Sequence, residues 1–231
     1  CLLKIDEENV PYIPFGDSDE ILIGEWVIAL GNPFGLFEIS DKATVTVGVI
    51  SATGMNLSPV DNRYYLDMIQ TDASINQGNS GGPLVNSIGE LIGMNTLIFT
   101  AEGSSGNVGV GFAIPSNKLQ KIVKELKESG VFERNFWTGL RIHSIDEGIA
   151  NYYKLDDTRG VIITDILDES PASKAGLQPG DIIREVDGFK IDNYETLKGV
   201  LQNYKTGETV SMKLLRDNKT QNIKMKLERR P

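Results

Sequence analysis

Near the middle of the chain stands the stretch Gln77-Gly78-Asn79-Ser80-Gly81-Gly82-Pro83-Leu84, in which a serine lies among glycines. Because glycine has no Cβ, such a stretch can form a tight turn that leaves the serine oxygen uncovered. The main-chain N–H groups of Gly78 and Ser80 would then lie beside that oxygen, as in an oxyanion hole. The pattern indicates a nucleophilic serine, and the alternative is a plain glycine turn that happens to contain one.

A serine hydroxyl is a useful nucleophile only when a base takes its proton and a carboxylate orients that base. The chain has one histidine, His143, which lies well downstream of Ser80. It follows Leu140 and Ile142, and strand alternation points it away from the face of Ile142, so we expect a surface or groove histidine. Asp72 has no histidine to orient and is interpreted as loop structure. Either the protein lacks a base for Ser80, or this chain is a piece of a longer protein.

The bulk composition narrows the class of protein. A length of 231 residues with a hydrophobic fraction of 40% favours two compact units, each with its own core. The formal charge of -9 argues against a phosphate-binding surface, so we expect no nucleic-acid partner. No apolar run approaches the roughly 20 residues that cross a bilayer. Residues 1–5 read as a strand without an initiator methionine, and we expect the natural chain to begin further upstream.

The sequence contains few side chains that could bind a metal ion or a cofactor. Cys1 is the single cysteine and His143 the single histidine, which excludes an internal disulfide and leaves a zinc site without ligands. We therefore expect no metal and no cofactor.

The first half of the chain has the pattern of a β protein. Residues 1–115 are short strands punctuated by glycine, asparagine and proline, which is typical of an antiparallel barrel or sandwich. The clearest strands cover residues 44–50, 91–96 and 108–114, and loops are expected at residues 32–35, 54–62 and 102–107. After Pro115 an apolar stripe at helical spacing predicts one amphipathic helix, capped by Ser116 and ended by Gly130.

The remainder mixes strands with two helical segments. In the first, Ser170 can cap the helix, Pro171 occupies its first position and Gly176 ends it. In the second, the apolar stripe of residues 197–204 follows a capping Asp192 or Asn193. Alternating residues on both sides of Asp217-Asn218 predict a closing hairpin.

The segment from Thr71 to Leu84 closely resembles the active-serine segment of the HtrA/Deg serine proteases. Supporting matches in the family order lie at residues 24–35, 89–96 and 111–115, and residues 170–183 look like the heart of a PDZ domain. The resemblance implies a mainly β fold with some α: a trypsin-like antiparallel β-barrel, the second of two with the first largely absent, followed by an α+β PDZ domain. The implied boundaries are a protease part at 1–128, a linker at 129–137 and a PDZ domain at 138–231.

The resemblance also implies an activity. It suggests an ATP-independent serine endopeptidase of the periplasm or cell envelope that degrades unfolded or damaged proteins. Ser80 would attack the peptide carbonyl, the amides of Gly78 and Ser80 would hold the oxyanion, and the triad histidine and aspartate would lie upstream of Cys1. The family is commonly homotrimeric. The alternative is a non-catalytic, chaperone-like module that binds peptides through the PDZ domain and an incomplete barrel.

Substrate contacts also follow from the resemblance. Ile75 and Val110 would form the walls of an aliphatic specificity pocket, and the strand Thr96, Leu97, Ile98 would pair with substrate backbone; ordinary barrel core is the alternative. Residues 34–41, 54–65 and 100–107 would form the switch between active and inactive states.

In the PDZ domain a peptide C-terminus would add as a strand beside Leu140, Arg141 and Ile142, opposite the helix with Leu197 and Leu201. Its carboxylate would meet amides around Thr138, Gly139 and Leu140, and a plain turn into a strand is the alternative.

Overall fold

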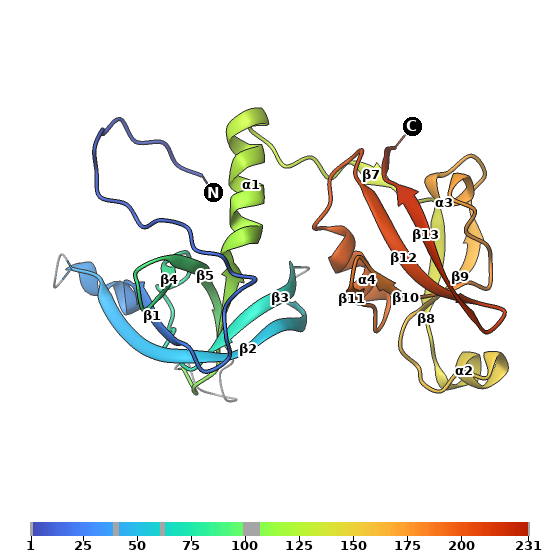
Figure 1. Cartoon of the computed structure of the whole chain (residues 1–231), viewed down its shortest axis with the longest axis horizontal. Coiled ribbons are helices and arrows are strands. Elements are labelled where there is room, and N and C mark those ends of the chain that lie inside the picture. Colours follow the sequence, from blue (N-terminus) through green and yellow to red (C-terminus); the bar gives the residue numbers. More distant parts are fainter. Residues whose placement is uncertain (1, 39–41, 61–62, 99–106, 231) are drawn as a thin grey trace. The chain divides into compact units, whose positions relative to one another are not determined.

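The computed structural model describes residues 2–38, 42–60, 63–98 and 107–230. The chain divides into two compact units, which Figure 1 colours along the sequence. The first contains Cys1–Leu57 and Tyr65–Val131, and the second contains Ser58–Tyr64 and Phe132–Pro231.

The first unit is a closed barrel with the strand order β1-β2-β3-β6-β5-β4. Its strands are β1 (Trp26–Gly31), β2 (Thr44–Val60), β3 (Arg63–Thr71), β4 (Pro83–Asn86), β5 (Leu91–Ile98) and β6 (Gly111–Pro115). Alternate residues face inward, as strand geometry requires, so Val27 and Ala29 of β1 are fully buried while Trp26 is 63% exposed. The barrel therefore confirms the antiparallel architecture expected from the alternating pattern.

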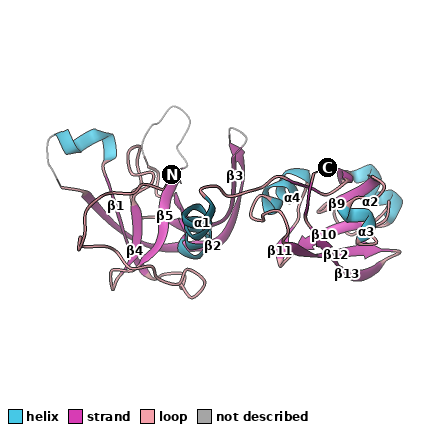
Figure 2. Cartoon of the chain, turned by 90° about the horizontal axis from the view of Figure 1, so that it is seen from above, coloured by secondary structure: helices cyan, strands magenta, loops and turns pink. Residues whose placement is uncertain are grey.

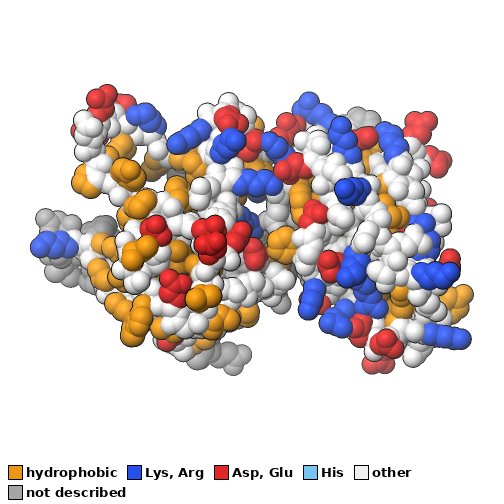
Figure 3. All heavy atoms as spheres, viewed as in Figure 1, with side chains coloured by type: hydrophobic (Ala, Val, Ile, Leu, Met, Phe, Trp, Pro, Cys, Tyr) orange, Lys and Arg blue, Asp and Glu red, His pale blue; other side chains and the backbone are white. Residues whose placement is uncertain are grey.

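The outer face of β1 and β2 is apolar. Val45 and Val47 are more than half exposed, and Val47 lies opposite Ile28 in the antiparallel register. Figure 3 shows hydrophobic side chains gathered over the visible face of this unit.

Several element boundaries differ from the sequence expectation. The strand expected from residue 44 continues to Val60, so it covers most of the loop expected at 54–62. The strand expected at 108–114 begins only at Gly111, since Gly109 turns the chain with φ +84°. Residues 2–5 form no strand, because no described segment pairs with them to complete a ladder. The loop at 32–35 leads into a 3-10 turn, η1 (Pro33–Glu38).

Helix α1 (Ser116–Ser129) closes the first unit. Gly130 ends it as expected, with φ +74° and its N–H bound to the Leu126 carbonyl. The expected cap by Ser116 is wrong: Pro115 occupies the cap position, and the Ser116 hydroxyl instead donates to the Gly16 carbonyl at 2.8 Å. That bond fixes the segment that precedes β1 against the start of the helix.

The second unit is built on a sheet with the order β13-β12-β10-β9-β8, to which β11 adds beside β10 (Figure 2). The bounds are β7 (Phe136–Trp137), β8 (Leu140–Ser144), β9 (Val161–Ile166), β10 (Ile182–Val186), β11 (Phe189–Lys190), β12 (Thr209–Arg216), β13 (Lys219–Lys226), β14 (Glu228–Arg229), α2 (Glu147–Tyr153), α3 (Pro171–Lys174) and α4 (Tyr194–Leu201). The expected hairpin closes at Asp217 and Asn218, both with positive φ.

The helix caps of the second unit use short polar side chains. Ser170 accepts from the Ser173 N–H at the start of α3, and Asn193 accepts from the Thr196 N–H at the start of α4. Helix α2, which the sequence pattern did not predict, starts in the same way at Asp146.

Part of the segment expected as a linker belongs to the second unit. β7 pairs antiparallel with β14, where Trp137 lies opposite Glu228 and Phe136 opposite Arg229. The Thr206 N–H also donates to the Glu133 carbonyl.

Candidate active site

Ser80 lies on a turn between β3 and β4, and its side chain is exposed. The turn is closed by a hydrogen bond from the Asn79 N–H to the Asn76 carbonyl at 3.0 Å and by one from the Gly82 N–H to the Asn79 carbonyl at 2.9 Å. Asn79 is 1% exposed, so consecutive residues point in opposite directions. The turn therefore presents the Ser80 hydroxyl to solvent, as the sequence predicted.

Glycines are required where this turn lies against the end of β1. Gly78 has φ +101°, and a Cβ built on it would lie 2.2 Å from the Asn32 carbonyl oxygen. A Cβ on Gly82 would lie 2.2 Å from the Leu30 carbonyl oxygen. Any side chain at either position would push the turn away from β1.

The main-chain donors beside Ser80 are available. The Gln77 carbonyl accepts from the Phe34 N–H at 2.9 Å, and because the peptide is trans and planar, the Gly78 N–H points the opposite way. Within the described part of the chain, neither the Gly78 N–H nor the Ser80 N–H has a hydrogen-bond acceptor. Two such donors can stabilise the negative oxygen of a tetrahedral intermediate.

The Ser80 hydroxyl donates to the main-chain carbonyl of Thr96 at 2.9 Å. Thr96 lies on β5 where the pairing with β6 shifts register, between Asn95 and Leu97. Such a bulge turns a main-chain group out of the regular ladder and is common beside active sites.

The residues considered for acid–base roles lie elsewhere. His143 is exposed on β8 of the second unit. The Asp72 carboxylate accepts from the Val49 N–H of β2 at 2.7 Å, so this side chain binds the segment before the nucleophile turn to β2.

The predicted substrate residues surround the same turn. Ile75 is 1% exposed and its Cδ1 lies 2.9 Å from the position of a Cβ on Gly111, so the two residues are in close contact. Val110, which precedes Gly111, is half-buried. β5 pairs with β4 no further than Met94, which leaves the backbone edge at Thr96 without a described partner strand. The side chains of Leu97 and Ile98, and most of the expected switch segment 100–107, lie outside the described residues.

The predicted peptide groove of the second unit lies along an edge strand. Among the described strands β8 pairs with β9 alone, and the Tyr194 N–H at the start of α4 donates to the Ser144 hydroxyl at 2.9 Å. Ile142 and Leu201 are half-buried, whereas Leu197 is 1% exposed and belongs to the core.

The loop before β8 depends on a glycine. Gly139 has φ +74°, and a Cβ there would lie 2.1 Å from the Ser170 Cβ. The Leu140 N–H donates to the Thr138 hydroxyl at 3.3 Å, within the loop itself. Arg141 is exposed and lies 3.6 Å from Asp165 across the pair of strands.

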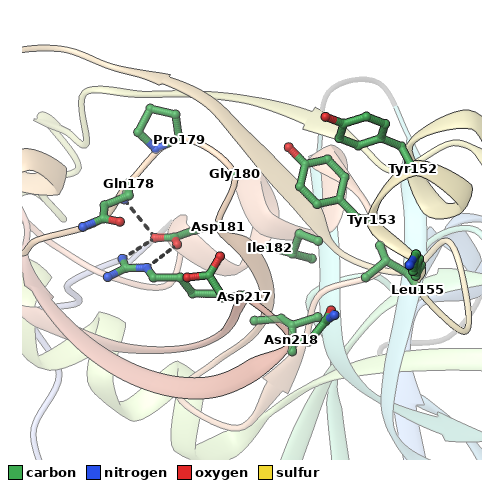
Figure 4. Close-up of a pocket in the computed structure, with 13 residues that line it drawn as sticks. Tyr152, Tyr153, Leu155, Gln178, Pro179, Gly180, Asp181, Ile182, Asp217 and Asn218 are labelled. Atoms are coloured by element: carbon green, nitrogen blue, oxygen red, sulfur yellow. Dashed lines mark hydrogen bonds and ion pairs between the residues drawn. The ribbon is translucent and has the colours of Figure 1, made fainter.

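A cavity of about 480 Å³ in the second unit was not predicted from the sequence (Figure 4). Its one buried carboxylate, Asp181, binds the Arg216 guanidinium at 2.6 and 2.7 Å and accepts from the Gln178 N–H at 2.9 Å. The hydrogen bonds from Arg216 to Asp181 raise the pKa of that guanidinium. The Asp181 carboxylate is therefore paired with Arg216 and with the main chain at Gln178.

Among the described residues no cluster of histidine, cysteine or acidic side chains could hold a metal ion. None of the helices in the described ranges is long and apolar enough to span a membrane.

The chain has close relatives in both of its parts. The family model of the trypsin-like peptidase domain matches residues 1–94, and that of the PDZ domain matches residues 115–227. A probable periplasmic serine endoprotease DegP-like from Marinomonas sp. (strain MWYL1) is 44% identical over 231 residues, which are 100% of this chain and 47% of that protein. The protein of the same description from Chlamydia trachomatis serovar D is 44% identical over 95% of this chain and 42% of its own length. The chain thus spans less than half the length of these relatives.

Solved structures agree with the sequence relatives. The HtrA-type protease AlgW with tripeptide has a TM-score of 0.71 and 36% identity, covering 99% of this chain and 72% of that chain. The serine endoprotease from Yersinia pestis has a TM-score of 0.57 and 33% identity over 99% of this chain and 70% of its own. The first unit is a barrel with an exposed serine on a glycine turn, and a PDZ unit follows it. Together with these relatives and solved structures, this architecture shows that the chain belongs to the HtrA-type, DegP-like family of serine proteases.

Proposed function

We propose that the protein is an ATP-independent serine endopeptidase of the periplasm, with Ser80 as its nucleophile. The observation that carries the proposal is the Ser80 turn: an exposed serine on a turn where the N–H groups of Gly78 and Ser80 have no acceptor among the described residues. In this mechanism a histidine from the remainder of the protein takes the Ser80 proton, the Oγ attacks the peptide carbonyl, and the two amides bind the resulting oxyanion. The names of the relatives favour this function over a non-catalytic peptide binder.

Substrate backbone would bind along the edge of β5 at Thr96, which has no partner strand among the described residues. A carbonyl such as that of Thr96 accepts an N–H from an extended peptide, and the half-buried Val110 and the buried Ile75 lie near enough to Gly111 to line an aliphatic pocket. This pocket would prefer small or medium apolar side chains, since no charged side chain is among its proposed walls. Unfolded polypeptides, which expose such side chains, would be the substrates.

The second unit would bind peptide C-termini by addition to the edge of β8. Support comes from the unpaired side of that strand and from the neighbouring helix α4 with the half-buried Leu201. The related HtrA-type protease AlgW has been solved with a tripeptide and with a decapeptide. We propose that the full-length protein assembles as a homotrimer or higher oligomer.

The test uses the full-length protein that contains this chain. A fluorophosphonate probe should label Ser80, as shown by mass spectrometry of the modified peptide, and the protein should hydrolyse an unfolded polypeptide without ATP. Ser80→Ala should abolish both, and Ser74→Ala, three residues before Gln77 in the same segment, should abolish neither. Absence of labelling in a folded wild-type protein, also with activating C-terminal peptides present, would exclude the protease.

A further inference from the structure

Asn95 is a buried side chain next to the nucleophile turn, and its amide nitrogen donates to two main-chain carbonyls. It is fully buried in β5, one residue before the Thr96 carbonyl that accepts from Ser80. Its main chain binds both residues that follow the serine: the Gly81 N–H donates to the Asn95 carbonyl at 2.8 Å, and the Asn95 N–H donates to the Gly82 carbonyl at 2.9 Å. The turn is therefore attached to β5 directly after Ser80.

The Asn95 side chain ties the same turn to two other strands. Its Nδ2 donates to the Pro83 carbonyl at 3.1 Å, where β4 begins, and to the Leu30 carbonyl at 3.4 Å, where β1 ends. One buried amide thus joins β1, β4 and β5 around the nucleophile turn. Removing it would leave main-chain carbonyls without their donor, which is costly when no water can replace it.

The bulge at Thr96 explains why an amide is needed here. Asn95 lies opposite Ala113 and Leu97 opposite Phe112, so Thr96 is an extra residue in the ladder. A bulge leaves its extra residue unpaired in the ladder, and here its carbonyl accepts from Ser80 instead. On one side of the bulge, the Asn95 side chain supplies hydrogen bonds to the main chain of β1 and β4.

We infer that Asn95 is a positioning residue for the nucleophile, an inference that rests on the proposed function of Ser80. Its main chain binds residues 81 and 82 and its side chain binds Pro83, and it directly precedes Thr96, whose carbonyl accepts from Ser80. Without it, the Ser80 hydroxyl loses its defined place relative to the oxyanion donors. A displacement of about 1 Å at a reacting atom is enough to slow catalysis about 100-fold.

The test compares Asn95→Leu with a matched control, Asn86→Leu, in the full-length protein. Asn86 is a second buried asparagine of the barrel, 8% exposed at the far end of β4, whose side chain accepts from the Ile88 and Glu90 N–H groups. Both replacements should lower the melting temperature. Only Asn95→Leu should slow fluorophosphonate labelling of Ser80, by about 100-fold, and lower kcat with little change in KM.

A second variant, Asn95→Asp, should label Ser80 at a rate that depends on pH, which general destabilisation does not produce. It also tests the positioning role if Asn95→Leu does not fold. The protonated acid can still donate one hydrogen bond to the carbonyls of Pro83 or Leu30, whereas the ionised acid can donate none. The labelling rate of the variant divided by that of the wild type should therefore fall as the pH rises, at a temperature where both are folded.

The results distinguish the positioning role of Asn95 from the proposed protease function of Ser80. If wild-type Ser80 is labelled and both Asn95 variants are labelled at the wild-type rate, or if Asn86→Leu slows labelling equally, the positioning role is wrong while the protease remains. A labelling ratio for Asn95→Asp that does not change with pH also contradicts the role. If folded wild-type protein is not labelled, the proposed function fails and the inference fails with it.

Discussion

Replacing Gly78 by alanine tests whether the close approach of the nucleophile turn to β1 is required for activity. Gly78 has φ +101°, a conformation that costs an L-residue roughly 1–2 kcal/mol. The new Cβ would also lie 2.2 Å from the Asn32 carbonyl oxygen, well inside the roughly 3.5 Å of a comfortable contact. Because that oxygen belongs to the main chain, the turn must move instead, and the Gly78 N–H moves with it.

The expected loss is that of one oxyanion donor, about 10²–10³-fold in kcat or about 3–4 kcal/mol in the barrier. Hydrolysis of a short peptide substrate by the full-length protein measures it. Gly81→Ala is the matched control: Gly81 has φ +88° and directly follows Ser80, but nothing lies within 4 Å of its added Cβ. We expect this control to lose less than about 10-fold, since it adds strain without a collision. Equal losses in the two variants would refute the reasoning.

Three further predictions concern stability and binding. Arg216→Leu should lower the unfolding free energy of the second unit by about 3–5 kcal/mol, because the carboxylate of Asp181, 1% exposed, loses its partner; a change below about 1 kcal/mol in urea unfolding would contradict this. Burial raises the pKa of Asp67, so its ionised form is unfavourable in the folded state and this cost grows as the pH rises above 3.8. Asp67→Asn, at φ +58°, which asparagine tolerates, should therefore stabilise the barrel more at pH 7 than at pH 3, and equal stabilisation at both pH values would exclude the titration. Gly139→Ala should weaken binding of C-terminal peptides at least about 10-fold, because its Cβ would lie 2.1 Å from that of Ser170; unchanged binding in a calorimetric titration would remove this loop from the site.

Local chemistry explains what the sequence could predict. The glycines around Ser80 indicated a tight turn with an exposed hydroxyl, and the structure has this turn. Ser170 and Asn193 cap their helices, and Gly130 ends α1, because each of these roles needs only the residue itself and its immediate neighbours. The short strands punctuated by glycine, asparagine and proline predicted an antiparallel barrel or sandwich, and the first unit is a closed barrel.

Contacts between distant segments explain what the sequence could not predict. Ser116 has the chemistry of a helix cap, but its hydroxyl binds the Gly16 carbonyl, a partner one hundred residues away in the sequence. Helix α2 has seven residues, too few for an apolar periodicity to stand out, although Asp146 at its start was a usable cap signal. The extension of β2 to Val60 likewise depends on pairing that no local pattern records.

Asn95 shows why the support of a reactive residue is harder to predict than the residue itself. The Ser80 turn is specified by neighbours in the sequence, whereas the partners of Asn95 come from two other strands, and Leu30 of β1 lies 65 residues away. The bulge at Thr96 arises because β5 must pair with β6 and also bind the turn, and a two-residue alternation cannot reveal it. An asparagine within an apolar strand was the one visible signal, since a buried amide persists there only when its hydrogen bonds are needed. The amide that binds around the turn is therefore a better guide to what holds Ser80 in place than the glycines that make the turn possible.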